Sequence, residues 1–154
     1  MIDAFLACQL FVVLFIALHD WIPLSGLNNL KAVHSADPKS KLVRVTVLST
    51  LPFAIGLVGS AYYSSTHFPM WLVWLLWITY GGATYGVLRT WYVPYLLVPE
   101  PARVARYQMT FANTHSFLPA RNGIVPNTLH VVFHAVLIAT VVLLVSLTYT
   151  RIFG

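Results

Sequence analysis

Two histidines four residues apart, His130 and His134, have the spacing in this 154-residue chain that best suits chemistry. On a helix, that spacing places both imidazoles on one face. Imidazole can take up or release a proton near neutral pH, and two imidazoles at this spacing can ligate one divalent metal ion. A metal- or histidine-dependent membrane enzyme is therefore one hypothesis for this sequence.

The remaining residues do not identify a reaction. A third metal ligand would have to come from Asp20 or His19, and no acidic general base lies between the two histidines. The chain contains no serine-nucleophile elbow, phosphate-binding loop or dinucleotide-binding glycine motif. Its single cysteine, Cys8, can form neither an intrachain disulfide nor a thiolate metal cluster. Histidines that only hydrogen-bond to the backbone or to tyrosine remain the simpler alternative.

The composition places these residues in a membrane protein. Hydrophobic residues make up 58% of the chain and charged residues 8%, whereas soluble domains carry about a quarter charged residues. Residues 2–21, 42–63, 70–91 and 128–149 are long and apolar enough, or nearly so, to cross a hydrocarbon core of about 30 Å as helices. We expect a single all-α domain over residues 1–154 that forms an antiparallel bundle of four transmembrane helices.

The second span has its own local pattern. Asp37 is expected to cap its start, because an acidic residue followed by proline is typical of a helix N-terminus. Pro52 lies inside the span and is expected to kink it. Gly56, Gly59 and Ser60 form a small-residue face on this span.

The third span carries Ile78, Gly82, Tyr85 and Arg89 on one helical stripe. Because polar residues within membrane spans usually face the protein interior, we expect this stripe to face inward. Gly82-x-x-x-Gly86 has the spacing that lets two helices approach closely. We expect it to pack within the bundle, with a homodimer interface as the alternative.

The connection between the third and fourth spans predicts a further helix. It begins with a proline-flanked glutamate, and Val104, Tyr107, Phe111 and His115 then follow at helical spacing. Basic and polar side chains lie largely away from that stripe. We therefore expect an amphipathic helix at about residues 100–117 that lies in the membrane interface.

The basic residues predict the orientation in the membrane. Eight of the nine Lys and Arg residues lie in or beside the first and third connections, and the ninth is Arg151. With four spans these two connections share one side, and an excess of Lys and Arg marks the cytoplasmic side. Both termini should therefore face out. This distribution accounts for the net charge of +5 without a nucleic-acid partner.

Polar side chains of the predicted spans converge near their cytoplasmic ends. Asp20 ends the first span, Arg89 lies near the end of the third, and His130 and His134 lie in the first turns of the fourth. We predict a cytoplasm-facing polar pocket covered by the third connection. The proposed ligand-binding residues are Asp20, Arg89, Arg121, Asn122, Asn127, His130 and His134, and the secondary candidates are His19, Tyr85 and His115.

The positive charge around this pocket favours an anionic amphiphile as ligand, such as a phospholipid, an isoprenoid phosphate or an acidic small molecule. Arg89 and Arg121 would hold the acidic group, and the histidines would hydrogen-bond to it or transfer a proton. Two alternatives stay open. One is an enzyme with a divalent metal at His130 and His134. The other is a structural or accessory subunit without a ligand, in which Asp20 and Arg89 pair to fix the bundle.

Three stretches of the chain are LHDWIPL at 18–24, WYVPY at 91–95 and THSFLPARNGIVPNTLH at 114–130. They resemble a kind of small bacterial four-helix inner-membrane protein, and the likeness covers most of the chain. The resemblance implies the four-span fold and a bacterial inner (cytoplasmic) membrane, with both termini periplasmic. It implies no activity.

Overall fold

The computed structural model describes residues 1–111 and 113–152. This part of the chain is helical and contains no β-strand. Three helices in it are long and apolar enough to cross a membrane: α3 (Lys39–Tyr62), a continuous rod (Met70–Leu96), and the Thr128–Thr150 part of α8 (Thr128–Ile152). The all-α class is therefore confirmed, and the chain has the long apolar helices of a membrane protein.

The rod Met70–Leu96 is an α-helix interrupted by two π-helical segments. It consists of α4 (Met70–Leu76), η1 (Trp77–Gly81), α5 (Gly82–Val87), η2 (Leu88–Tyr92) and α6 (Val93–Leu96). Single π-helical turns of this kind occur frequently at functional sites. The rod extends beyond the predicted third span, which ended at residue 91.

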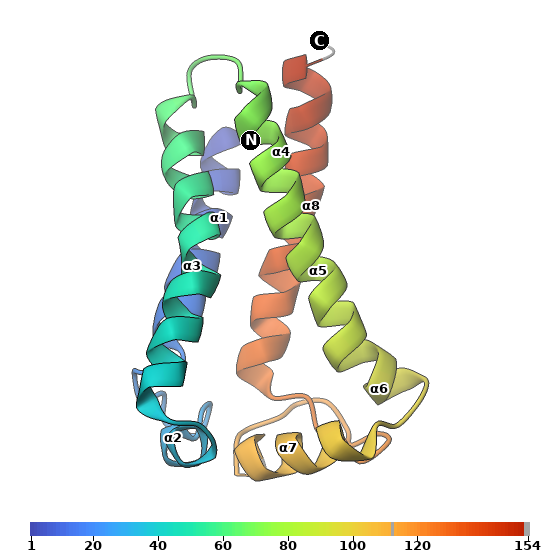
Figure 1. The fold of residues 1–154 in the computed structure, drawn as a ribbon. Coiled ribbons are helices and arrows are strands. Elements are labelled where there is room, and N and C mark those ends of the chain that lie inside the picture. The colour runs from blue at the N-terminus through green and yellow to red at the C-terminus, as the bar shows by residue number, and fades with distance from the viewer. Residues whose placement is uncertain (112, 153–154) are drawn as a thin grey trace.

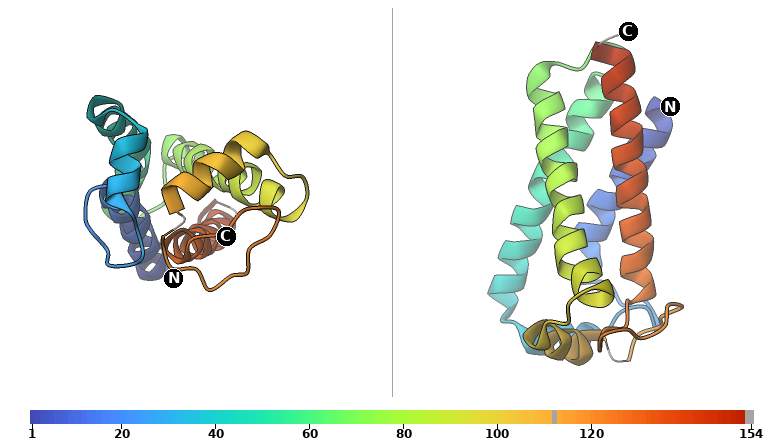
Figure 2. Two further views of the ribbon diagram at one scale, coloured as in Figure 1. Left: turned by 90° about the horizontal axis from the view of Figure 1, so that it is seen from below. Right: turned by 90° about the vertical axis from the view of Figure 1, so that its right-hand side faces the viewer.

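The first helix, α1 (Ile2–Leu18), lies beside α3 and α8, and the rod packs against α3 and α8 as well. The long helices run alternately up and down the molecule (Figures 1 and 2). The start of α1, the connection between α3 and α4, and the end of α8 lie toward one end of the molecule (Figure 1). Two shorter helices, α2 (Leu30–Ala36) and α7 (Pro101–Phe111), lie at the other end, which we call the α7 end.

The long helices share one apolar core and are apolar on the outside as well. Core side chains come from α1, α3, the rod and α8, and include Phe5, Val12, Phe53, Leu72, Leu76, Leu137 and Leu144. On the outer surface, Leu48 is 63% exposed and Val142 is 59% exposed. Soluble proteins rarely expose large continuous apolar surfaces, so these outward faces suit contact with lipid.

Close packing of small residues occurs on α3. A Cβ atom on Gly59 would lie 2.8 Å from Cδ1 of Leu72, and one on Gly56 would lie 3.0 Å from Cδ2 of Leu76. The small-residue face of the second span therefore packs against the rod. Gly82 and Gly86 have no such neighbour within 4 Å. Their predicted packing within the bundle is wrong, because this stripe faces outward.

The first span ends earlier than predicted. α1 ends at Leu18 instead of residue 21, because the backbone N–H groups of Trp21 and Ile22 both donate to Leu18 O at 2.9 Å and form a turn. Asn28 of the first connection completes this end: its Nδ2 donates to His19 O at 2.7 Å and to Ile22 O at 2.8 Å. The last carbonyl groups of a helix need such partners.

α7 is shorter than the predicted helix at about 100–117: it ends at Phe111, and the following residues bond back to Phe111 and then to other segments. The backbone N–H and Oγ1 of Thr114 donate to Phe111 O at 3.1 and 2.8 Å. The next residue, His115, donates its N–H to Gly26 O of the first connection at 2.6 Å and accepts from the first N–H of α8 at 2.9 Å.

Gly59→Leu should destabilise the protein, because the added side chain would overlap Leu72, and overpacking of this kind costs about 1–3 kcal/mol. The matched control is Gly82→Leu, which has open space and should unfold at the same temperature as the wild type. Thermal unfolding followed by circular dichroism in detergent measures both. An equal loss of stability in the two variants would contradict the outward orientation of Gly82.

Candidate functional site

A cavity of about 310 Å³ opens at the α7 end. Its walls come from the end of α1, from α2, from the start of α3, from η2, from α7 and from the start of α8. The view from below in Figure 2 shows how α2 and α7 lie across this end of the longer helices. We call this cavity the α7 pocket. Its lining residues range from His19 to His130, so the pocket brings together segments that are far apart in the sequence.

An aromatic cluster around Trp91 of η2 forms one wall of the α7 pocket. The Trp91 ring stacks on Tyr107 of α7, with centroids 4.4 Å apart, and on His130 of α8, with centroids 5.0 Å apart. Phe111 and His134 contact the same indole at centroid distances of 5.4 and 5.5 Å. Aromatic pairs contribute about 0.5–1.5 kcal/mol each beyond the burial of their area. Trp91 therefore joins the rod to both α7 and α8.

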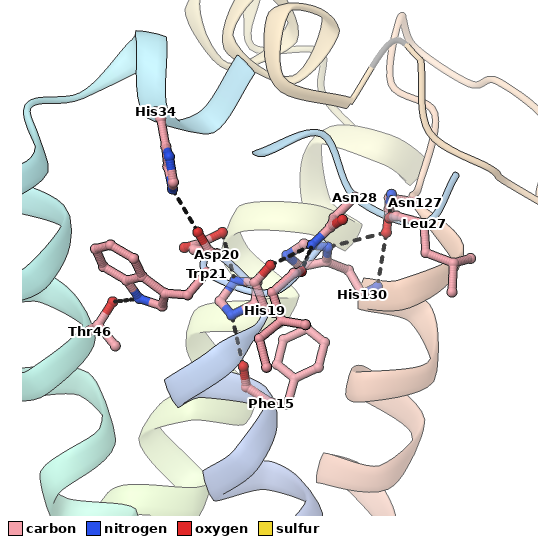
Figure 3. Close-up of polar contacts among 11 residues, drawn as sticks. Phe15, His19, Asp20, Trp21, Leu27, Asn28, His34, Thr46, Asn127 and His130 are labelled. Atoms are coloured by element: carbon pink, nitrogen blue, oxygen red, sulfur yellow. Dashed lines mark hydrogen bonds and ion pairs between the residues drawn. The ribbon is translucent and has the colours of Figure 1, made fainter. Parts of the chain in front are cut away.

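His19 and Asp20 form the wall of the pocket at the end of α1 (Figure 3). Nδ1 of His19 lies 2.8 Å from Phe15 O, and its Nε2 lies 3.3 Å from Oδ1 of Asp20. Both partner atoms are hydrogen-bond acceptors. The rings of His19 and His130 lie 5.5 Å apart between centroids. His19 therefore points into the pocket beside a carboxylate and a second imidazole.

Asn127 fixes the start of α8 and, with it, the position of His130 (Figure 3). Its Oδ1 accepts from the His130 N–H at 3.2 Å, as helix-capping side chains do, and its Nδ2 donates to Leu27 O at 2.8 Å. Asn127 is 1% exposed, and His130 lines the α7 pocket. These two predicted residues therefore lie on the inward face of α8.

His134 lies one turn deeper, is 2% exposed, and lies outside the α7 pocket. It packs against Trp91, Tyr92 and Phe133. Its Nδ1 is buried and has no hydrogen-bond partner in the described part of the chain. A void of about 10 Å³ beside His134 is close to the smallest space that holds one water molecule.

Among the residues that the structure describes, no third ligand joins His130 and His134, the predicted metal ligands. The ring centroids of His130 and His134 are 6.3 Å apart, and among residues 1–111 and 113–150 no three His, Cys, Asp or Glu side chains could hold an ion together. Asp20 and His19, the predicted sources of a third ligand, pair with each other. The metal hypothesis stays a prediction.

The cations of the α7 pocket are Lys41 and Arg106, whose side chains are 49% and 59% exposed. Asp37, at 12% exposed, bridges them: Oδ1 accepts from Lys41 Nζ at 2.5 Å, and Oδ2 accepts from Arg106 Nη2 at 2.8 Å. These hydrogen bonds hold the pKa of the Asp37 carboxyl below its ordinary value. Asp37 was predicted to cap α3, but Pro38 occupies that position, and the Asp37 side chain instead joins the α2–α3 connection to α7.

Arg89 lies outside the α7 pocket, so the predicted Asp20–Arg89 pair is wrong. Arg89 shares the outward face of the rod with Tyr85, which is 71% exposed, and its guanidinium pairs with Glu100. Nε of Arg103 donates to the other oxygen of Glu100 at 3.0 Å. The two arginines hold the pKa of Glu100 below its ordinary value. An arginine near a helix end can extend to water, so it does not require an inward face.

Three further predicted residues, His115, Arg121 and Asn122, hold the third connection together and do not line the α7 pocket. Nδ2 of Asn122 donates to the carbonyls of two consecutive α6 residues, Pro94 and Tyr95, at 3.3 and 3.2 Å. Nδ1 of His115 lies 2.8 Å from the hydroxyl of the first residue of α8. The Arg121 backbone closes a turn through two hydrogen bonds of 2.9 Å.

Lys41, Trp91, Arg106 and Phe111 line the pocket but are absent from the predicted site residues. Trp91 packs inward from a π-helical segment, whose spacing differs from the α-helical spacing on which the prediction was based. Lys41 and Arg106 have no local signal in the sequence either. They meet only because α7 crosses the end of the longer helices, and no local pattern in the sequence sets that crossing.

No protein-family model, curated protein or solved structure matches this chain. The chemistry of the α7 pocket is therefore the basis for assigning a function.

Acid should weaken the attachment of α7 through Glu100. Because the folded-state pKa of Glu100 lies below 4.5, its ion pairs stabilise the fold above about pH 4.5 and lose that contribution as the pH falls through the lower folded-state value. The unfolding temperature of the wild type should therefore fall between about pH 6 and pH 3, and that of Glu100→Gln should fall less steeply. Superimposable profiles in thermal unfolding would contradict a stabilising role for Glu100.

Proposed function

We propose that this protein binds an anionic amphiphile in the α7 pocket, at the cytoplasmic surface of a bacterial inner membrane. One observation carries the proposal: a single cavity combines two chemically different kinds of wall. Lys41 and Arg106 line it at exposed positions, and Leu42, Trp91 and Phe111 supply apolar and aromatic surface. A ligand with an acidic headgroup and an apolar chain matches both kinds of wall.

A further cation lies beside the pocket. Lys41 also lines a neighbouring hollow with Arg44. Each Lys or Arg near a membrane surface contributes about 1 kcal/mol to the attraction of anionic lipid. Arg44 therefore adds to the attraction of the pocket for an anionic headgroup.

The size of the α7 pocket supports binding of part of an amphiphile. Small-molecule sites have volumes of about 300–1,000 Å³, and the 310 Å³ of this cavity lies at the lower limit. Val45 lines the cavity and is also 50% exposed on α3, among the apolar side chains of the outer surface. In the proposal the headgroup and the first part of the chain occupy the pocket, and the rest of the chain leaves past Val45 into the bilayer.

The proposal counts α1 as a fourth span. Its 17 residues give a length of about 26 Å, close to the hydrocarbon thickness of about 30 Å. With four spans, the α7 end carries eight of the nine Lys and Arg residues and would face the cytoplasm. Both termini would then be periplasmic. A homodimer through the open face at Gly82 and Gly86 stays a prediction.

The double variant Lys41→Ala, Arg106→Ala should lose a bound amphiphile, because it removes both cations that line the pocket. We expect an anionic species that copurifies with the wild type in mild detergent to fall by about tenfold, since charge-assisted hydrogen bonds are roughly twice as strong as neutral ones. Mass spectrometry of the extracted lipids and small acids measures this change.

The charge-matched control is Lys31→Ala, Arg121→Ala, which removes two cations from the α7 end that do not line the pocket. It should keep the wild-type set of bound molecules. If the wild type and both double variants retain the same lipids in the same amounts, binding in the α7 pocket is ruled out.

The orientation can be tested by cysteine labelling in a Cys8→Ser background. A membrane-impermeant maleimide added to intact cells should label Ser65→Cys, in the connection between α3 and α4. It should label Ala120→Cys, in the third connection, only after lysis, because that side is expected to be cytoplasmic. Labelling of Ala120→Cys in intact cells would reverse the orientation.

A further inference from the structure

The two cations of the α7 pocket are already occupied by one carboxylate of the same chain. Each oxygen of Asp37 takes one cation, Lys41 at 2.5 Å and Arg106 at 2.8 Å. The remaining acidic residue of the pocket, Asp20, is engaged by His19 at 3.3 Å. An anionic headgroup that lies between Lys41 and Arg106 and uses the N–H donors that now face Asp37 must therefore displace the Asp37 carboxylate.

We infer that Asp37 is a built-in competitor for the headgroup, so that the α7 pocket selects amphiphiles with a phosphate monoester. This inference rests on the proposed function and names the ligand class of the same site. Asp37 is tethered next to the two cations, and groups held by short links reach effective concentrations in the millimolar range. A headgroup with a single negative charge would gain little binding free energy by displacing the Asp37 carboxylate.

A phosphate monoester can outcompete this carboxylate. It carries about 1.5 to 2 negative charges at neutral pH and three terminal oxygens, whereas Asp37 carries one charge and two oxygens. It can therefore give Lys41 and Arg106 an oxygen each and keep a third terminal oxygen for a further donor. Phosphate diesters and carboxylates carry one charge, as Asp37 does.

The position of Asp37 allows it to leave. It lies in the connection between α2 and α3 with an extended backbone, and its side chain receives hydrogen bonds only from the two cations among the contacts described. Its release would also break the Asp37–Arg106 pair, which joins α7 to the α2–α3 connection. Headgroup binding would therefore also loosen α7 on that side.

The test compares octyl phosphate with methyl octyl phosphate, a diester of the same chain length. Binding is measured by titration calorimetry on the whole protein in nanodiscs of zwitterionic phosphatidylcholine, with empty nanodiscs as the blank. The wild type should bind the monoester about tenfold more tightly than the diester, a difference of about 1.4 kcal/mol. Equal affinities in the wild type would overturn the inference without the use of any variant.

Asp37→Asn should bind both compounds more tightly than the wild type, by about fivefold or more, because the competitor is gone. The matched control is Glu100→Gln. Glu100 also holds two cations and contacts α7, but it lies outside the α7 pocket, so its replacement should change neither affinity. If Asp37→Asn gives no gain, or if Glu100→Gln gives the same gain through a looser α7, Asp37 is not a competitor.

The same titrations also test the proposed function. No binding of octyl phosphate to the wild type or to Asp37→Asn would overturn both proposals. Inorganic phosphate that binds as tightly as octyl phosphate would show a site for free phosphate instead of an amphiphile. Tight binding of the monoester with no effect of Asp37→Asn would leave the proposed function standing and overturn only the competition.

Discussion

The site depends above all on the stacking of Trp91 against Tyr107 and His130. The three rings come from the rod, α7 and α8. A short segment joins the rod to α7, whereas a longer one joins α7 to α8. α7 has an apolar side that must be covered, and the Trp91 indole provides the surface for it. The ion pairs of Asp37 and Glu100 then fix α7 from two sides, but exposed pairs of this kind contribute little energy. The aromatic contact stabilises α7 in its place over the pocket, and the ion pairs set its orientation.

Part of this site could be predicted because hydrocarbon tolerates few polar side chains. Asp20 and His130 had to lie near helix ends, where water and other polar groups can reach them, and both line the same cavity. Asn127 was expected on the inward stripe of α8, and it caps that helix from a nearly fully buried position. Depth in the membrane and the inward face of a regular helix follow from spacing alone.

The face of the third helix could not be predicted in the same way. Arg89 was taken as inward because it is polar, but its long side chain reaches Glu100 from the outer face. Trp91, two residues later, turns inward instead, within a π-helical segment whose spacing differs from that of an α-helix. The approach of Arg106 to Asp37 depends on two connections that fold against each other. It spans 69 residues of sequence, and no local pattern encodes it.

The hydrogen bond from Asn127 to Leu27 has a consequence for biosynthesis. It joins the first connection to the start of the last helix across 100 residues of sequence. At a synthesis rate of about 5–20 residues per second, roughly 5–20 s pass between the emergence of the two partners. During that interval His19 lacks its contact with the His130 ring, and Leu27 O is not yet paired with Asn127. The pocket is therefore completed late, when α8 packs beside α1.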